Sequence, residues 1–416
     1  VTLIMLIQKK LMKSNLPAER ETMFNPQSKV LYHLDRVVDF FNNKIVDPIN
    51  VEIDPSNACN HSCPFCISGH LHLSKYKGTE FFNRQMMSRD ILMNFAKDIS
   101  TTQTKSISWT GGGEPTMNPH LKDAIKYIKE NSEIEMGMFT NGSMLERFDL
   151  FDTLVKSLTW IRISLDSGIA ENYDKLRVTN KSNNFEIVLK NIKKLIEYKK
   201  KLKSDITIGV GFVVSKDNFE EILDFAKLFK NLDVDYCQYK PEIIQVERNS
   251  SESKKDQIPP EFWAKKIIKL LDEASEILGN KFQCNSYKLK DLIVHNNKQY
   301  GREYKQCLGS QFQPLVGADG EVYVCTSHRG HKERSYGNLK DRSFTEIWSD
   351  MTKRKCVMSQ IENKEKFSMC SQLCKPHESN KVIWNIKENL HKNGLINKLQ
   401  LKSKELESKI VHKNFI

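Results

Sequence analysis

Hydrophobic residues follow two alternating spacings along the chain. Short segments rich in Val, Ile and aromatic residues are typical of strands, and longer segments with apolar residues three or four positions apart are typical of helices. Strands are predicted at 49–56, 105–115, 134–143, 160–168, 205–215 and 234–243. Helices between or after them are predicted at 120–131, 151–158, 184–202 and 218–232.

This alternation predicts an α/β fold in which six strands form a partial (β/α)6 TIM-type barrel. A helix between two strands returns the chain parallel to the first strand, so the carboxyl ends of the strands share one edge, where functional residues are expected. Further helices are predicted over 29–46 and 261–279, with a polar linker at 245–260. A hairpin is predicted at 313–325, and a lysine-rich helical tail over 380–416.

The composition predicts a globular, cytoplasmic protein. The chain has 39% hydrophobic and 28% charged residues and a mean hydropathy of −0.52. No segment approaches the roughly 20 apolar residues that a membrane-spanning helix needs. Residues 1–13 place apolar residues before lysines, the reverse of a secretory signal, and no small-residue cleavage site follows. Val1 in place of Met leaves the true start open.

The net charge of +12 does not by itself indicate nucleic acid. Most lysines fall in helical segments such as 191–205, mixed with acidic residues, and no RGG tract, zinc-finger spacing or ribonucleoprotein motif accompanies them. Solvated helix faces therefore explain the charge best. Anionic small molecules come second as an explanation, and nucleic acid comes last.

Three of the ten cysteines lie within eight positions, because Cys59, Cys63 and Cys66 are spaced C-x3-C-x2-C. In a cytoplasmic chain, such a group more often binds metal or takes part in catalysis than forms disulfides. Soft thiolates suit zinc or an iron–sulfur cluster, and three ligands on a [4Fe–4S] cube leave one iron open. A zinc knuckle completed by His61 or His70 is the alternative that spacing alone leaves open.

A glycine-rich loop follows the second predicted strand, with the sequence T-G-G-G-E-P from Thr110 to Pro115. Glycines let the backbone approach a ligand closely, and a carboxylate beside them can receive an ammonium group. Together with the cysteine motif, in which Phe65 precedes the last cysteine, this loop resembles the radical S-adenosylmethionine (SAM) enzymes. The resemblance covers about residues 48–245.

The resemblance implies a SAM-binding [4Fe–4S] cluster on the three cysteines, with SAM chelating the open iron. An electron, supplied by a flavodoxin- or ferredoxin-type donor, cleaves a C–S bond of SAM, and the 5′-deoxyadenosyl radical abstracts a hydrogen from the substrate. Gly112, Gly113 and Glu114 match the residues that hold the methionine ammonium in the family.

Four further residues match family positions near SAM. Ser164 and Asp166, at the end of the fourth strand, match contacts to the ribose or the methionine end. Asn141, within the T-N-G stretch at 140–142, borders the same place, and Arg177 resembles the arginine opposite the SAM carboxylate. A simple turn at 140–142 and a surface ion pair of Arg177 remain the alternatives.

A second group of cysteines resembles the C-terminal extension called SPASM, or its short form, twitch. It has too few cysteines for the two clusters of a full SPASM domain, so one auxiliary [4Fe–4S] cluster is predicted, with a structural zinc as the alternative. Its predicted ligands are Cys307, Cys325, Cys370 and Cys374. Cys356 is interpreted as a spare on a helix, and Cys237 and Cys284 as small core residues.

The chain thus divides into a radical SAM partial barrel, a small C-terminal auxiliary iron–sulfur domain and three connecting or terminal segments. The predicted boundaries are 1–47 for an N-terminal helical segment, 48–245 for the barrel, 246–304 for a linker and helix, 305–379 for the auxiliary domain and 380–416 for a helical tail.

The single auxiliary cluster resembles dehydrogenases of sugars and aminocyclitols, and also enzymes that crosslink or epimerise ribosomally made peptides. Only about 47 residues precede the first strand, fewer than the winged-helix module that peptide maturases often carry, so a small-molecule substrate is expected. Its candidate contacts are Gln238, Tyr239, Lys240 and Glu242, and no catalytic acid or base is identified. A non-catalytic iron–sulfur or zinc protein that binds nucleic acid is the third hypothesis.

Overall fold

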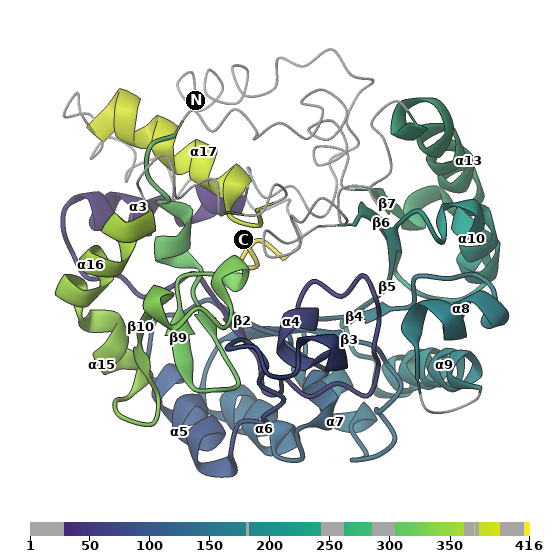
Figure 1. The fold of residues 1–416 in the computed structure, drawn as a ribbon, viewed down its shortest axis with the longest axis horizontal. Helices are drawn as coiled ribbons and strands as arrows, with labels where there is room; N and C mark the ends of the chain where they lie inside the picture. The colour runs from purple at the N-terminus through teal and green to yellow at the C-terminus, as the bar shows by residue number, and fades with distance from the viewer. Residues whose placement is uncertain are drawn as a thin grey trace.

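The computed structural model shows an open ten-stranded sheet with helices over its outer face (Figure 1). It describes residues 29–179, 183–242, 262–284, 304–361, 370, 374–391 and 412–416. The strand order is β10-β9-β8-β1-β2-β3-β4-β5-β6-β7, so β10 and β7 form two unjoined edges. The predicted partial barrel is therefore confirmed, and the sheet does not close on itself.

All six predicted strands are present, and they pair in parallel and in sequence order. They are β1 (Asn50–Ile53), β2 (Ser106–Trp109), β3 (Glu135–Thr140), β4 (Trp160–Ser164), β5 (Thr207–Val214) and β6 (Tyr236–Pro241). The short strand β7 (Phe282–Cys284) extends the sheet parallel to β6, in a segment where no strand was predicted.

Helices connect the strands, as parallel pairing requires. The predicted ones are α6 (Leu121–Asn131), α7 (Phe151–Ser157), α9 (Asn184–Leu202), α10 (Ile222–Lys230) after the turn η4 (Phe219–Glu221), and α13 (Ile268–Leu278) after the π-helix η6 (Trp263–Ile267). Two others were not predicted, α5 (Arg89–Ile99) and α8 (Ala170–Arg177). The signal for α5 is present in the sequence, because the Ser88 hydroxyl caps its first turn and its apolar residues have helical spacing.

The two faces of the sheet differ in chemistry. The outer face packs apolar side chains such as Val51, Ile161 and Phe212 against the helices. The inner face carries the alternate residues, including bulky rings that lie over glycines of the neighbouring strand. A side chain at Gly137 would collide with the Trp160 ring, with its Cβ only 2.0 Å away. Glycine at this position therefore makes room for a large inner-face side chain.

The predicted auxiliary region continues the same sheet. Its strands are β8 (Leu315–Val316), β9 (Glu321–Tyr323) and β10 (Ser335–Asn338), and its helices are α15 (Phe344–Ser349), α16 (Met351–Ile361) and α17 (His377–Ile386). The hairpin predicted at 313–325 forms between β8 and β9, and β8 also pairs in parallel with β1. The first barrel strand therefore has a C-terminal segment as one neighbour.

Both described ends of the chain pack near this junction. The short helices η1 (Leu31–His33) and α3 (Leu34–Phe41) contact Phe312 and α17. Residues 412–416 lie inside the curve of the sheet (Figure 1), where the carbonyl oxygen of Asn414 accepts a 2.6 Å hydrogen bond from Ser106 Oγ. None of the described helices is long and apolar enough to cross a bilayer.

Several predicted segments fall wholly or partly outside the described residues. These are 1–28 of the N-terminal segment, all of the linker at 245–260, 285–303 of the segment between the linker and the auxiliary domain, 362–369 and 371–373 of the predicted auxiliary domain, and 392–411 of the tail. Within the described tail, α17 continues into the π-helix η12 (Lys387–His391), in agreement with the helix predicted there.

Candidate active site

The cysteine loop begins directly after β1 and is fixed by the glycine-rich loop that follows β2. The Gly113 amide donates a 2.9 Å hydrogen bond to the Ser56 carbonyl, and the Glu114 amide donates one of 2.9 Å to the Ala58 carbonyl. The two predicted motifs therefore lie against each other at the carboxyl ends of neighbouring parallel strands, as expected for this fold.

This close approach depends on the missing side chains of the glycines. A Cβ at Gly113 would lie 2.1 Å from the carbonyl oxygen of Ala58, and one at Gly112 would lie 2.1 Å from Asn57 Oδ1. That Asn57 oxygen is buried and has no hydrogen-bond partner in the described residues. Only glycine can therefore occupy position 113 while the cysteine loop keeps its present path, because the clash there is with backbone, whereas at position 112 side chains would have to shift.

Cys59, Cys63 and Cys66 are free thiols on this loop. Burial raises the pKa of Cys59 well above its ordinary value and that of Cys63 to about 11, and the neighbouring cysteines raise both further. The three sulfur atoms therefore lie near one another in a site where bare thiolates are unfavourable. Iron removes this conflict by binding thiolates directly, so the loop fits an iron–sulfur cluster.

Both neighbouring histidines have polar neighbours of their own. His61 is buried, with Nε2 2.9 Å from Asn184 Nδ2, and burial lowers its pKa to about 3. Nε2 of His70 lies 3.2 Å from the carbonyl oxygen of Arg329. No contact of either histidine with the cysteines distinguishes zinc from an iron–sulfur cluster among the described residues, so the choice between the two stays a prediction.

The Glu114 carboxylate links the loop after β2 to the end of β3 through hydrogen bonds. One carboxylate oxygen accepts hydrogen bonds from the amide and hydroxyl of Thr116 and from the Thr140 hydroxyl, and the other accepts a 2.7 Å bond from the Asn141 amide. These four bonds use most of the accepting capacity of a carboxylate. Glu114 thus holds the 140–142 turn beside the glycines, and its predicted contact with the SAM ammonium stays a prediction.

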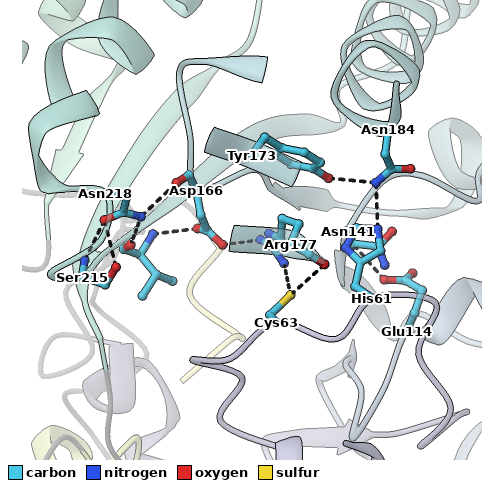
Figure 2. Close-up of polar contacts among 11 residues, drawn as sticks. His61, Cys63, Glu114, Asn141, Asp166, Tyr173, Arg177, Asn184, Ser215 and Asn218 are labelled. Carbon is cyan, nitrogen blue, oxygen red and sulfur yellow. Dashed lines mark hydrogen bonds and ion pairs between the residues drawn. The ribbon is translucent and has the colours of Figure 1, made fainter. Parts of the chain in front are cut away.

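Asp166 and Arg177, each predicted to contact SAM, form an ion pair with each other (Figure 2). Asp166 also accepts a 2.7 Å hydrogen bond from the Val213 amide, and Arg177 Nη1 lies 3.6 Å from Cys63 Sγ. Burial opposes the charge on Arg177, but the charges of Asp166 and Cys63 outweigh it and raise its pKa. The surface ion pair considered for Arg177 is wrong, because both partners are buried.

The other predicted contacts divide between the two faces of the sheet. Ser164 on β4, and Gln238 and Lys240 on β6, alternate with outward-facing core residues and so lie on the inner face. Tyr239 points outward, where its hydroxyl donates a 2.9 Å hydrogen bond to the Ile222 carbonyl. Its expected role as a substrate contact is therefore not supported, since alternate residues of a strand face opposite sides.

The second cysteine group gathers beside β9. Burial raises the pKa of Cys325 to about 12, and the nearby thiols of Cys307 and Cys370 contribute. Cys374 is half-buried, whereas Cys356 is exposed on α16, as expected for a spare cysteine. The described members of this group thus fit a second thiolate-bound cluster, and the assignment of its four ligands stays a prediction.

Two arginines near the site were not singled out in the sequence, the buried Arg329 and the half-buried Arg162. Arg329 forms a two-pronged ion pair with Asp54, at the end of β1, and donates a 3.0 Å hydrogen bond to Ser68. Arg162 lies on the inner face of β4. The sequence pattern that could have identified Arg162 is its alternation with Ile161 and Ile163, which places the arginine on the face of the strand opposite the core.

Two family models match the chain in the regions just described. The model of the radical SAM superfamily matches residues 53–228, and the model of an iron–sulfur cluster-binding domain, SPASM, matches residues 307–375. A probable GTP 3′,8-cyclase from Saccharolobus islandicus is 26% identical over 199 residues, which are 48% of this chain and 57% of that protein. The chain therefore spans less than two thirds of this relative.

Solved structures share the fold at low sequence identity. SuiB of Streptococcus suis bound to the precursor peptide SuiA is 14% identical, with a TM-score of 0.58 over 88% of this chain and 82% of that one. The enzyme anSMEcpe with bound AdoMet and a Cp18Cys peptide is 18% identical, with a TM-score of 0.53 over 85% of this chain and 99% of that one.

The two domains account for both cysteine groups. They imply SAM, a SAM-binding [4Fe–4S] cluster and an auxiliary iron–sulfur cluster as the cofactors. These cofactors fit the geometry of the cysteine loop, the glycine-rich loop and the second group of cysteines. The chain therefore contains a radical SAM domain, matched over residues 53–228, and a SPASM-type iron–sulfur domain, matched over residues 307–375.

Proposed function

We propose that this protein uses SAM to start a radical reaction on a small polar molecule, with oxidation or epimerisation as the outcome. The cofactors supply reductive cleavage of SAM to a 5′-deoxyadenosyl radical that abstracts a substrate hydrogen. The observation that carries the proposal is the three-cysteine loop, whose backbone lies directly against Gly112 and Gly113 of the glycine-rich loop.

The protein residues would bind and orient these groups. Cys59, Cys63 and Cys66 would hold the first cluster, and the backbone of the glycine loop would meet the methionine end of SAM. Arg177 would keep positive charge beside Cys63, because Asp166 stabilises its charged form. The auxiliary cluster would be held by Cys307, Cys325, Cys370 and Cys374 and would supply electron transfer. A flavodoxin- or ferredoxin-type protein would be the electron donor.

A ribosomally made peptide is the second candidate substrate. SuiB and anSMEcpe, whose folds resemble this one, were both solved with a peptide bound. At 14% and 18% identity this likeness concerns the fold alone, so the peptide ranks second. Sugars, aminocyclitols and peptides can be compared directly by asking which of them increases 5′-deoxyadenosine formation above the rate without substrate.

Anaerobic reconstitution tests the proposed cofactor use. Wild-type protein is expected to hold about eight irons, enough for two cubes, and to form 5′-deoxyadenosine from SAM on reduction. Cys63→Ala should abolish this cleavage, because it removes a ligand of the open cluster. Zinc in place of iron, without SAM cleavage, would overturn the proposal.

Matched cysteine variants test the auxiliary cluster. Cys370→Ala is expected to lose about half of the iron, because one cube of two would fail to assemble. Cys356→Ala should keep the full iron content, since its thiol is exposed on α16. Equal iron contents in the two variants would show that Cys370 is not a ligand.

A further inference from the structure

Arg162 is an enclosed cation on the inner face of the sheet without an anionic partner among the described residues. Its Nη1 donates a hydrogen bond to Gln238 Oε1, and its guanidinium carbon lies 4.2 Å from the centre of the Phe139 ring. Its Nε is buried and has no hydrogen-bond partner. Both contacts are with neutral groups, although a buried charge is ordinarily paired with an opposite charge.

Four acidic side chains on the inner face or at the strand ends are engaged elsewhere. They are Glu52 with Lys375, Asp54 with Arg329, Glu114 with four donors, and Asp166 with Arg177 and the Val213 amide. Burial lowers the pKa of Arg162 and the charge of Asp166 opposes this shift, but guanidinium is not deprotonated in proteins, so Arg162 remains charged at neutral pH. Asp166 itself pairs with Arg177, so no carboxylate among the described residues forms an ion pair with Arg162.

The neighbouring strands leave room for Arg162, and β7 at the edge of the sheet offers a second unsatisfied polar group. Gly209 pairs with Arg162 in register, and a Cβ at Gly211, two residues further along β5, would only touch the Arg162 side chain, at 3.5 Å. On β7, Gln283 pairs in register with Gln238, the hydrogen-bond partner of Arg162, and its buried Oε1 has no hydrogen-bond partner among the described residues. This oxygen can accept a hydrogen bond from a hydroxyl or amino group.

Arg162 lies nearer the amino end of β4 than Ser164, which is one of the proposed SAM contacts. It precedes Ser164 by two residues on the same face, which corresponds to roughly 7 Å along the strand. A molecule bound to Arg162 would thus extend toward the carboxyl ends of the strands, where the cysteine and glycine loops lie.

We propose that Arg162 binds an oxyanion of the substrate, a carboxylate or a phosphate, while Gln283 accepts a hydrogen bond from a neighbouring hydroxyl or amino group. This inference rests on the proposed radical SAM function and specifies the chemistry of its substrate. The charge-assisted contact would fix one end of the molecule and so select which carbon faces SAM.

Anion binding to the reconstituted enzyme tests this role. Sodium acetate and inorganic phosphate serve as the two probes, titrated calorimetrically at constant ionic strength. At least one is expected to bind wild-type enzyme about tenfold or more tightly than Arg162→Gln, with Arg162→Lys between them. A preference for acetate or for phosphate would identify the oxyanion. Arg342→Gln is the matched control, because Arg342 is an exposed arginine of the C-terminal region and should bind like wild type.

The outcomes separate this inference from the proposed function. Equal anion affinities in wild type and Arg162→Gln, each folded by circular dichroism, would overturn the role of Arg162. Loss of anion binding when wild-type enzyme is saturated with SAM would also overturn it, since the arginine would then serve the SAM carboxylate. Wild-type enzyme that does not cleave SAM would instead refute the proposed function, whatever its anion affinity.

Discussion

At the scale of single residues, the site is organised by buried charged side chains that form ion pairs with one another. Asp166 has a left-handed backbone, with φ of 61°, and its carboxylate faces both Arg177 and the Val213 amide. Arg177 in turn reaches Cys63. These contacts join the end of β4, the end of α8 and the cysteine loop (Figure 2), so a change at one of them should affect the others.

Removing one partner of the buried Asp166–Arg177 ion pair should lower the free energy of unfolding. Arg177→Gln leaves Asp166 charged and unpaired, and is expected to lower the free energy of unfolding by about 3–5 kcal/mol. Adding Asp166→Asn should restore part of the loss, because it removes the charge and asparagine tolerates positive φ. Denaturant titration of both variants measures this.

Lys175→Gln is the exposed control for this cycle. Its pair with Glu171 lies at the surface, with side-chain exposures of 68% and 83%, so the change should be below about 1 kcal/mol. A double variant no more stable than Arg177→Gln alone would contradict the account of the buried pair.

A second residue-scale expectation concerns pH. Burial lowers the pKa of His33 from 6.5 to about 4, so between these values the unfolded chain binds a proton that the folded chain does not. Stability should therefore fall as the pH drops from 6.5 toward 4, with His33 contributing up to about 1 kcal/mol per pH unit. His33→Gln should flatten the slope of the unfolding free energy measured from pH 7 to pH 5. Parallel slopes in the two proteins would show that His33 is not responsible.

At the scale of elements, the important junction is between two loops at the ends of β1 and β2. Their hydrogen bonds are between backbone atoms, so sequence motifs alone do not reveal how closely they approach. The requirement for glycine at 113 comes from this contact rather than from backbone angles, because Gly113 does not have a positive φ.

Replacing a glycine of the glycine-rich loop with alanine should displace the cysteine loop. Gly113→Ala would place a methyl group 2.1 Å from the Ala58 carbonyl oxygen, so the reconstituted protein should lose most of the iron of the first cluster. Gly78→Ala is the control, because nothing lies within 4 Å of its added Cβ and only its positive φ is strained. Iron analysis and visible absorption compare the two variants. Full iron content in Gly113→Ala would mean that the loop adapts.

At the scale of the whole molecule, the C-terminal region and the barrel are parts of one sheet. Strand β8 pairs with β1, and Arg329 reaches across to Asp54 and Ser68 on either side of the cysteine loop. Through these contacts, Arg329 forms a short buried path between the two cysteine-bearing regions.

This path predicts that the two regions depend on each other for stability. Arg329→Gln leaves Asp54, which is fully buried, without its cation, and should lower the free energy of unfolding by about 3–5 kcal/mol. Arg342→Gln, with 43% of its side chain exposed, should change stability by no more than about 0.5 kcal/mol. Similar denaturation midpoints for the two variants would refute the proposed coupling.

Much of the fold and part of the site could be predicted from local signals. The six parallel strands followed from alternating apolar segments, and α5 could have been found from its cap and spacing, whereas β7 has only three residues. The cysteine and glycine motifs identified the two loops because their chemistry is contained in short stretches. The direction of Tyr239 could have been predicted from strand alternation, which places it opposite Gln238 and Lys240.

By itself, the sequence determined the parallel order of β1 to β6, the positions of the two cysteine groups and the domains that they resemble, because each depends on nearby residues. Only the tertiary structure decided that Asp166 pairs with Arg177, that Arg329 reaches Asp54, and that Arg162 lacks an anionic partner among the described residues. The physical reason is distance along the chain. Arg329 and Asp54 are 275 positions apart, and a buried charge is compensated by whatever the fold brings next to it.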